Sequence, residues 1–474
     1  MYKSITSLLL GLVLIAPLAR ADKKASGKAN APAARAADPV AKPAIPKLEF
    51  TDTRLSNGLR VIIAPDHSAP VYAIAVTYNV GAHNELPGHT GFAHLFEHMM
   101  FQGSENVGKG EHFILVYNNG GGMNGTTTED RTNYYESLPK NQLDLALYLE
   151  ADRMRALAVN QANLDNQRNA VQEERRLGID NQPYGKAYLD IDNLAYDNFA
   201  YKHSVIGSMS DLDAAKLQDV KDFFRIYYAP NNAVLTLVGD LDPQATLEAV
   251  KKYFGNIPSQ PAPPPVDMQE PEHYGERRET IVDPLARLPQ VIIGYHVPTG
   301  NTPDNWAARV LGNVLGEGES SRFYEHLVKD KQLATDISVQ VDARRGPSMF
   351  YIVAMPRPGV KPEDLEKAIY DEIDAVAKNG ITDQELAKAR AQFRRELVQR
   401  RQTDLQTAIS IGQYAVFFDD PNLINTAYDK FSAVNPAQVK EVAAKYLVAK
   451  DRAVVTTVPP AKRAAQEGAN GGIQ

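Results

Sequence analysis

His94-Leu95-Phe96-Glu97-His98 is the stretch from which the fold and the chemistry of this chain are inferred. On a helix, residues four positions apart lie one turn apart on the same face, so His94 and His98 would hold two imidazoles side by side with the Glu97 carboxylate near them. Imidazole nitrogens bind zinc well, a catalytic zinc site has three protein ligands and one open position, and a nearby carboxylate can take a proton from the bound water. The stretch therefore predicts the metal helix of a zinc hydrolase.

A simpler interpretation of the same stretch needs no metal. Phe92, Leu95, Phe96 and the residues 99–101 would form the apolar face of an amphipathic helix. The histidines would then only mark the polar edge of that helix. Sequence outside the stretch has to decide between the two interpretations.

Length and composition limit the class of protein. The 474 residues exceed what one compact core usually holds, and 43% hydrophobic with 23% charged residues is ordinary for a soluble globular protein. A net charge of −7 without a basic stripe predicts no binding to nucleic acid. The chain has no cysteine, which excludes disulfides, thiolate nucleophiles and sulfur-ligated metals. A metal would need nitrogen and oxygen ligands.

The first residues resemble an export signal. Lys3 supplies a positive charge, residues 8–18 are apolar, and Ala19-Arg20-Ala21 is a small-x-small cleavage site. We predict a signal peptide over residues 1–21, and the apolar stretch is too short to span a bilayer. Residues 22–47 are rich in Ala, Lys and Pro and predict a disordered tether. An exported chain without cysteine fits a bacterial periplasm.

A proline-rich connector at residues 257–274 separates two halves of nearly equal length. We predict domains at 48–256 and 275–460, followed by a disordered tail at 461–474. The halves look like diverged copies, because two patterns of the first half recur about 217 to 219 residues later. The patterns at residues 219–238 and 73–80 return at residues 438–458 and 291–297. A nearly constant offset is what a duplication produces.

The duplication limits where a metal can bind. An offset of 217 carries the metal motif onto Leu311, Val314 and Leu315, so the second half keeps the helix without its ligands. Apolar periodicity predicts strands and helices within both halves. The strands are expected at 61–64 and 71–80, and helices at 142–157, 164–177 and 362–377. Strands clustered between helix pairs predict an α+β fold with helices on one face of each sheet.

Two histidines leave the metal short of one ligand. The helical run at residues 171–176 contains Glu173 and Glu174, which are about 100° apart on a helix, so only one of them can face a metal. An acidic and basic run on a helix is more often a solvated face. The residues alone leave both glutamates open.

Three motifs together resemble the pitrilysin or insulinase type of inverzincin peptidase, in the branch similar to the mitochondrial processing peptidases. They are the leader at residues 55–61, the block at 91–99 and the Phe-Gln-Gly-Ser that starts at Phe101. The resemblance extends from about Leu48 to Pro459. It implies two homologous halves, each a mostly antiparallel sheet with helices packed on one face, that form a half-clamshell. It also implies zinc on His94, His98 and Glu174, with Glu97 as the general base.

The stretch Gly120-Gly121-Gly122-Met123-Asn124-Gly125-Thr126-Thr127 also matches the family, where it leads into an edge strand beside the metal. An edge strand can add a peptide as one more strand through its free main-chain groups. We therefore expect Asn124 and Gly125 to bind substrate. A simple tight turn is the alternative interpretation of these glycines.

The second half departs from the family after the landmark segment at residues 316–324. Relatives that work alone carry an arginine and a tyrosine there that hold substrate and stabilise the oxyanion, whereas this chain has Val328 and Thr335. Relatives also usually carry a glutamate where this chain has Gln167, a change that can alter metal affinity. These departures suggest the zinc-bearing subunit of a heterodimer with a metal-free homologue, or else a homodimer.

The sequence thus predicts a zinc metalloendopeptidase that cleaves peptides or unfolded polypeptides in an enclosed chamber. A non-catalytic peptide-binding or assembly subunit that keeps the ancestral site is the alternative, and a purely structural half-shell is a third interpretation. Manganese or cobalt could also occupy two nitrogens and one oxygen. The other histidines are interpreted as surface or core residues; they are His67, His83, His89, His112, His203, His273, His296 and His326.

Overall fold

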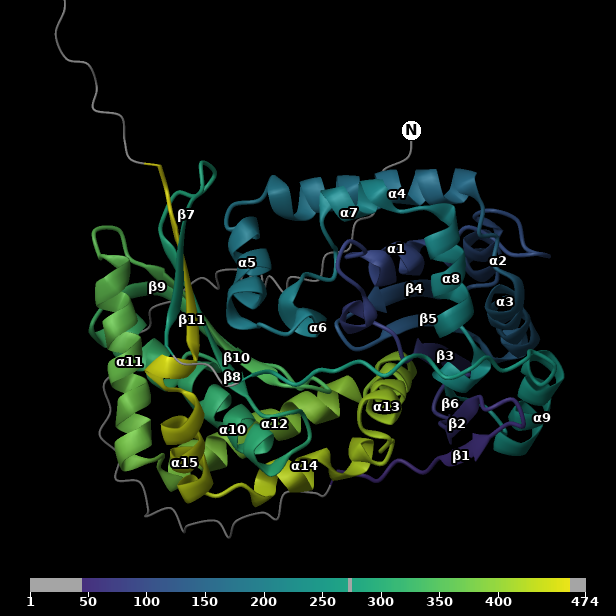
Figure 1. Ribbon diagram of the computed structural model, residues 1–474. Helices are drawn as coiled ribbons and strands as arrows, with labels where there is room; N and C mark the ends of the chain where they lie inside the picture. The colour runs from purple at the N-terminus through teal and green to yellow at the C-terminus, as the bar shows by residue number, and fades with distance from the viewer. Residues whose placement is uncertain (1–44, 272–274, 461–474) are drawn as a thin grey trace, which may run out of the picture. The chain divides into compact units, whose positions relative to one another are not determined.

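The computed structural model describes residues 45–271 and 275–460 (Figure 1). The predicted signal peptide, the tail and nearly all of the tether lie outside the described residues. All elements below belong to one unit that begins at Leu48.

Within the described residues the strands form two sheets. The first sheet contains β1 (Thr51–Arg54), β2 (Arg60–Pro65), β3 (Val71–Tyr78), β4 (Gly122–Thr127), β5 (Thr132–Pro139) and β6 (Ala233–Gly239), in the order β1-β2-β6-β3-β5-β4. The second contains β7 (Arg277–Val282), β8 (Gln290–Val297), β9 (Ala334–Val341), β10 (Ser348–Pro356) and β11 (Arg452–Val458), in the order β7-β11-β8-β10-β9.

The two sheets repeat one topology. Apart from β1, their orders correspond strand by strand, and each contains one parallel pair, β2 with β6 and β7 with β11, among antiparallel neighbours. This correspondence supports the duplication inferred from the recurring sequence patterns. The prediction of mostly antiparallel sheets in an α+β fold is confirmed.

The helices of the first half are α1 (Phe92–Met99), α2 (Glu111–Asn118), α3 (Leu143–Ala156), α4 (Gln161–Arg175), α5 (Gly185–Ala195), α6 (Phe199–Lys202), α7 (Met209–Ala214), α8 (Leu217–Tyr227) and α9 (Pro243–Phe254). Those of the second half are α10 (Pro303–Gly316), α11 (Pro362–Asn379), α12 (Asp383–Arg400), α13 (Asp404–Phe418), α14 (Leu423–Ala433) and α15 (Pro436–Tyr446). The three helices predicted from periodicity are α3, α4 and α11. Helix α4 starts three residues earlier than predicted because the Asn160 side chain accepts a hydrogen bond from the Asn163 N–H and caps it.

Helix α10 occupies the place in the second half that α1 occupies in the first. Leu311, Val314 and Leu315, which stand where α1 has its two histidines and Glu97, are buried apolar residues of α10. In the second half the corresponding side of this helix is therefore part of the core.

Each half lends a helix to the sheet of the other half (Figure 1). Ala408, Ile411 and Ala415 of α13 pack on the first sheet, against six apolar side chains: Ile62, Ala64, Ala73, Ala75, Val234 and Val238. Ala187, Ile191 and Ala195 of α5 pack on the second sheet, against Ile281, Ile292, Met349, Ala453 and Val455. Because both faces of the central strands are covered, β3 is buried along almost its whole length and is nearly continuously apolar.

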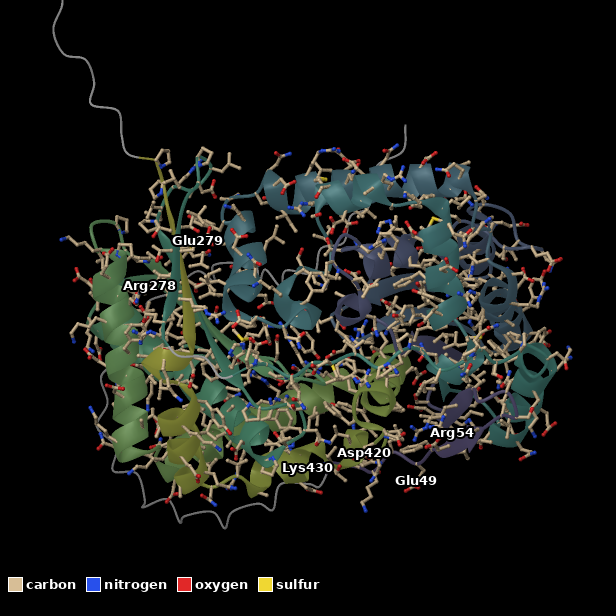
Figure 2. The ribbon with its side chains drawn as sticks, viewed as in Figure 1. Glu49, Arg54, Arg278, Glu279, Asp420 and Lys430 are labelled. Carbon is tan, nitrogen blue, oxygen red and sulfur yellow. The ribbon has the colours of Figure 1, made fainter. Side chains whose placement is uncertain are left out.

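Charged side chains lie on the edge strands β1 and β7 but not on β4, the edge strand next to α1. Figure 2 shows Arg54 on β1 and the neighbouring Arg278 and Glu279 on β7. Charged side chains on an edge strand discourage pairing with another chain. Edge strand β4, Gly-Met-Asn-Gly-Thr-Thr, has no charged residue. Its free edge therefore lacks the protection that β1 and β7 have.

Candidate metal centre

Helix α1 is fixed at its N-terminus by a carboxylate from outside the helix. Its N-cap, Gly91, has a φ of 87° and offers no side chain, so the first N–H groups need another acceptor. The buried Glu85 carboxylate accepts from the N–H groups of Gly91 at 2.8 Å and Ala93 at 2.7 Å. These two bonds satisfy N–H groups that the helix itself leaves without an acceptor. Glu85 therefore sets where α1 starts.

The amphipathic interpretation and the metal interpretation of α1 are both compatible with the structure. Phe92, Leu95, Phe96 and Met99 are buried, and the Phe96 ring packs against aromatic rings of α8 and Tyr228. The histidines lie on a different side of the helix. The apolar face therefore anchors α1 while the opposite face remains available for chemistry.

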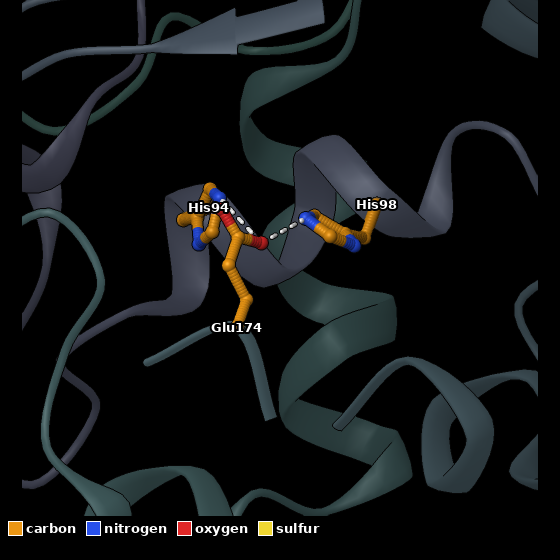
Figure 3. Close-up of side chains that lie close together, drawn as sticks. All are labelled: His94, His98 and Glu174. Atoms are coloured by element: carbon orange, nitrogen blue, oxygen red, sulfur yellow. Dashed lines mark ion pairs between the residues drawn. The ribbon is translucent and has the colours of Figure 1, made fainter. Parts of the chain in front are cut away.

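Three candidate ligands from two helices converge at one point (Figure 3). His94 and His98 come from α1 and Glu174 from α4, and their ligand atoms all lie within 4.8 Å of one another. Glu174 Oε2 lies 3.2 Å from His98 Nε2 and 3.8 Å from His94 Nε2. Glu173, by contrast, is more than half exposed and pairs with Arg176 at 3.3 Å. Geometry thus places Glu174, and not Glu173, against the histidines.

These residues suit a zinc ion. Two imidazole nitrogens and one carboxylate oxygen are a known catalytic zinc set and a poor one for magnesium or calcium. Burial and the neighbouring His98 lower the pKa of His94 to about 4, so its ring stays neutral and can donate a lone pair. The buried Nδ1 of His94 has no hydrogen-bond partner in the described structure.

Glu97 lies beside the three ligands and is held by a threonine. Its Oε2 accepts a hydrogen bond of 2.5 Å from Thr127 Oγ1. Burial raises the pKa of Glu97, a direction that makes a carboxylate a better proton acceptor. A Cβ at Gly125 would lie 3.1 Å from Glu97 Cγ, so a glycine there gives the carboxylate room.

Asn124 and Gly125 lie within edge strand β4 and not in the turn that precedes it. The turn is at Gly120, whose φ is 79°. The Asn124 side chain is directed back to the main chain, because its Oδ1 accepts from the Gly125 N–H at 2.9 Å.

A cavity of about 250 Å³ opens next to Glu97 and His98. Its other lining residues are Phe101, Gln102, Phe113, Asn124 and Gln167. Gln167 also hydrogen-bonds to the His98 ring, so this departure from the family contacts a candidate ligand directly. The sequence interpretation did not include Thr127, although it lies at the end of the glycine-rich stretch that was singled out.

The structure also brings together a group that the sequence spacing concealed. His112, Glu136 and Glu150 are buried, and each offers one ligand atom that lies within 4.8 Å of the other two. The buried Arg153 guanidinium forms an ion pair with Glu150 and lies 4.6 Å from the Tyr134 ring centroid. Because an arginine already provides the positive charge, this group is a poor candidate for a second metal.

The two departures in the second half occupy different surroundings. Val328 is buried in a π-helical turn at Tyr324–Asp330, and Thr335 is an exposed residue of β9. Arg357 donates to the main-chain oxygens of Val328 at 3.4 Å and Ala334 at 3.3 Å.

Known proteins with this arrangement identify the family. Residues 60–204 match the family described as insulinase (peptidase family M16), and residues 214–393 match the peptidase M16 inactive domain. The zinc protease PqqE of Helicobacter pylori is 33% identical over 375 residues, which span 78% of this chain and 84% of that protein. The chain belongs to peptidase family M16. Its fold and its membership in a protease family are therefore established.

Other members of M16 extend the comparison. A probable mitochondrial-processing peptidase subunit beta of Arabidopsis thaliana is 22% identical over 86% of this chain and 78% of its own length. The crystal structure of a protease from Helicobacter pylori superposes with a TM-score of 0.83 at 30% identity, covering 87% of this chain and all of that one. A peptidase M16 inactive domain from Pseudomonas fluorescens shares the fold, with a TM-score of 0.78 at 19% identity over 87% and 98% of the two chains. No helix in the described part of this M16 chain is long and apolar enough to cross a membrane.

Proposed function

We propose that this chain is a zinc metalloendopeptidase in which His94, His98 and Glu174 hold the metal and Glu97 is the general base. The observation that carries the proposal is the convergence of three ligand atoms within 4.8 Å, with the Glu97 carboxylate beside them. Zinc in this position supplies a Lewis acid that polarises a peptide carbonyl and makes a water molecule more acidic.

The protein's own groups would handle the proton. Glu97 accepts it from the attacking water and returns it to the amine that leaves, which is general base and then general acid catalysis by one carboxylate. Burial raises the pKa of Glu97, which makes its carboxylate a better proton acceptor. Thr127 keeps one carboxylate oxygen in place by donating its hydroxyl hydrogen.

Substrate would add to the first sheet as an extra strand along β4. This edge is free of charge, unlike β1 and β7, and Asn124 and Gly125 lie on it next to Glu97. Main-chain pairing makes little demand on sequence, which suits peptides and unfolded polypeptides. The cavity beside Glu97 has room for one substrate side chain.

A second subunit would complete the chamber. Val328 and Thr335 supply neither a cation nor a phenol, so we propose a metal-free homologue as heterodimer partner, with a homodimer as the variant of this assembly. The predicted signal peptide at residues 1–21 would place the enzyme in the periplasm. A non-catalytic peptide-binding subunit is the second candidate function, and it is favoured by the same two substitutions.

Cleavage of a quenched-peptide library tests the proposal. The mature protein is assayed alone and after co-expression with its genomic neighbour, with metal content measured in parallel. Glu97→Gln should abolish cleavage while zinc stays bound, and Glu173→Gln, which changes an exposed neighbour of the site, should leave both unchanged. Chelation should remove activity and zinc together. Stoichiometric zinc without cleavage under either condition would favour the peptide-binding function instead.

A further inference from the structure

The two helices that carry the candidate ligands are joined by a third stretch of chain. This bridging segment, residues 204–215, includes the short helix α7 and contacts both the start of α1 and one side of α4. It carries none of the candidate ligands itself. Its contacts show what it does.

At its first end the bridging segment holds the residues that lead into α1. Asp211 Oδ2 accepts from the N–H of Thr90 at 3.0 Å and from its hydroxyl at 2.5 Å. The N–H of Ser208 donates to the Thr90 hydroxyl at 3.0 Å. Thr90 is buried and directly precedes Gly91, so these bonds act together with Glu85 to hold the start of α1 in place.

Two glycines let the main chains touch at this end. A Cβ at Gly207 would lie only 2.4 Å from the Gly91 Cα, and one at Gly91 would lie 2.7 Å from the Ile206 oxygen. Both glycines have positive φ, at 74° and 87°. Side chains on either residue would push the bridging segment away from α1.

At its other end the bridging segment is bonded to α4. Arg168 donates to the main-chain oxygens of Leu212 at 2.9 Å and Ala215 at 2.6 Å. Gln172 donates to Asp213 at 2.7 Å, and Arg175 donates to the Gly207 oxygen.

The spacing of these three donors explains how α4 serves two purposes. Arg168, Gln172 and Arg175 follow one another at i, i+4 and i+7 and form one stripe along the helix. The adjacent stripe is turned one position away on the helix. It consists of Gln167, the fully buried Val171 and Glu174. The first stripe contacts the bridging segment, while Gln167 and Glu174 of the second contact the histidines of α1.

We propose that the bridging segment sets the distance between α1 and α4, and that Asp211 and Arg168 are positioning residues for the metal centre. This inference rests on the proposed function. A zinc site tolerates ligand displacements of only a few tenths of an ångström. His94 and His98 lie on one helix and Glu174 on the other, so a change in the distance between the helices changes the site.

Zinc affinity of the full chain tests the proposal, measured by competition with a chromophoric chelator. Asp211→Ala removes two of the hydrogen bonds between the bridging segment and Thr90, and Arg168→Ala removes two of those between the segment and α4. Each should weaken zinc binding by about 10-fold, the lower end for loss of a supporting contact around a metal. The absorption bands of the cobalt-substituted protein should shift, because they report the ligand geometry.

The double variant separates a bridge from two independent supports. A bridge that is loosened at one end no longer holds the distance, so loosening the other end should add little to the first effect. If the two substitutions acted independently, their effects on zinc affinity would instead add up. Asp222→Ala and Arg225→Ala, which remove an exposed pair on α8 with an N–O distance of 3.1 Å, are the matched controls and should leave affinity unchanged.

The outcomes distinguish this inference from the proposed function. A wild-type protein that binds zinc while both variants bind it equally well overturns the bridge and leaves the metal centre intact. A wild-type protein that binds no zinc overturns both. If Asp211→Ala does not fold, Asp211→Asn keeps the shape of the side chain and should weaken zinc binding by a few-fold; unchanged affinity in that variant also overturns the proposal.

Discussion

Thr127 is a residue whose role becomes visible only in three dimensions. Its hydroxyl donates to Glu97 at 2.5 Å, and a hydrogen bond to a carboxylate is worth about 1.5–3 kcal/mol. Thr127→Val should therefore lower kcat for peptide cleavage by roughly 10-fold, with zinc content and KM nearly unchanged. Thr127→Ser keeps the hydroxyl and should retain most of the activity. A loss in Thr127→Ser with none in Thr127→Val would show that the methyl group matters and not the hydrogen bond.

Gly412 has no side chain and therefore lets α13 of the second half pack closely on β3 of the first half. A Cβ at this position of α13 would lie 2.5 Å from the Thr77 hydroxyl oxygen of β3. In a free helix alanine is favoured over glycine by about 1 kcal/mol, but overpacking a tight contact costs about 1–3 kcal/mol. Gly412→Ala should therefore lower the free energy of unfolding, measured in urea. Gly122→Ala, where a Cβ meets nothing within 4 Å, should not, and stabilisation by Gly412→Ala would contradict the packing.

The sequence could predict which residues are candidate ligands, but not how they come together in one site. His94 and His98 lie four positions apart, so helix geometry alone places them together. The choice of Glu174 over Glu173 needed the family resemblance, because it depends on how α4 lies on α1 across 76 residues of chain. Thr127 and Gln167 enter the site through contacts that no local pattern encodes.

Helix α12 illustrates an element whose start is fixed by charge. Arg322 pairs with Glu385 at 2.5 Å and 2.9 Å, and Thr382 caps the helix beside them. Partial burial opposes ionisation, yet the bonds from Arg322 and Thr382 dominate and lower the pKa of Glu385 from 4.5 to about 2. A carboxyl group whose pKa is lower in the folded state stabilises the fold at pH values above its pKa in the unfolded chain. This stabilisation is lost as the pH falls from about 4.5 toward 2.

Glu385→Gln should expose that dependence. We expect it to lower the free energy of unfolding by about 1 kcal/mol at pH 7, since solvent reduces the full effect of the shift. The difference from wild type should be smaller at pH 3.5, measured by urea unfolding at both pH values. Glu396→Gln changes a more exposed pair with Arg400 on the same helix and should show little effect. A difference that stays constant with pH would contradict the assignment.

Secondary structure followed from the sequence where the apolar period was clear. Helices α3 and α11 lie within two residues of their predicted ranges, and β2 and β3 contain or nearly match the predicted strands. The parallel pairing of β2 with β6 could not be predicted, because it joins strands about 170 residues apart. Periodicity records which face of an element is buried and not which element covers it.

At the scale of the whole molecule, the exchange of α5 and α13 makes each half depend on the other. A fragment of residues 48–256 would lack α13 and expose the apolar face of the first sheet that contains Ile62 and Val234. We expect this fragment to be unfolded or aggregated alone and to gain a cooperative transition when the 275–460 fragment is added, followed by circular dichroism. The intact chain should unfold in one transition. A 48–256 fragment that unfolds cooperatively at the temperature of the full chain would contradict this interdependence.

The duplication was predictable from the constant offset, but the exchange of helices was not. The two copies share much of one series of strands and helices, and the order of the elements along the chain is the same whether a helix packs on its own sheet or on the other. The small residues of α13, such as Ala408 and Gly412, are compatible with either arrangement. Only the contacts with β3 and β6 decide it.

The exchange of helices also limits how a polypeptide could reach Glu97. Two halves that open on a hinge must separate along a surface that neither half needs for its stability. Here that surface is formed by α13 and α5, each packed on a face of the opposite sheet. Pulling the halves apart would strip α13 from β3 and α5 from β8 and would cost much of the fold. If substrate binds along β4 as proposed, it would approach from beyond the chain's own halves, along the open side of that strand, and access to Glu97 would be controlled by whatever covers that edge.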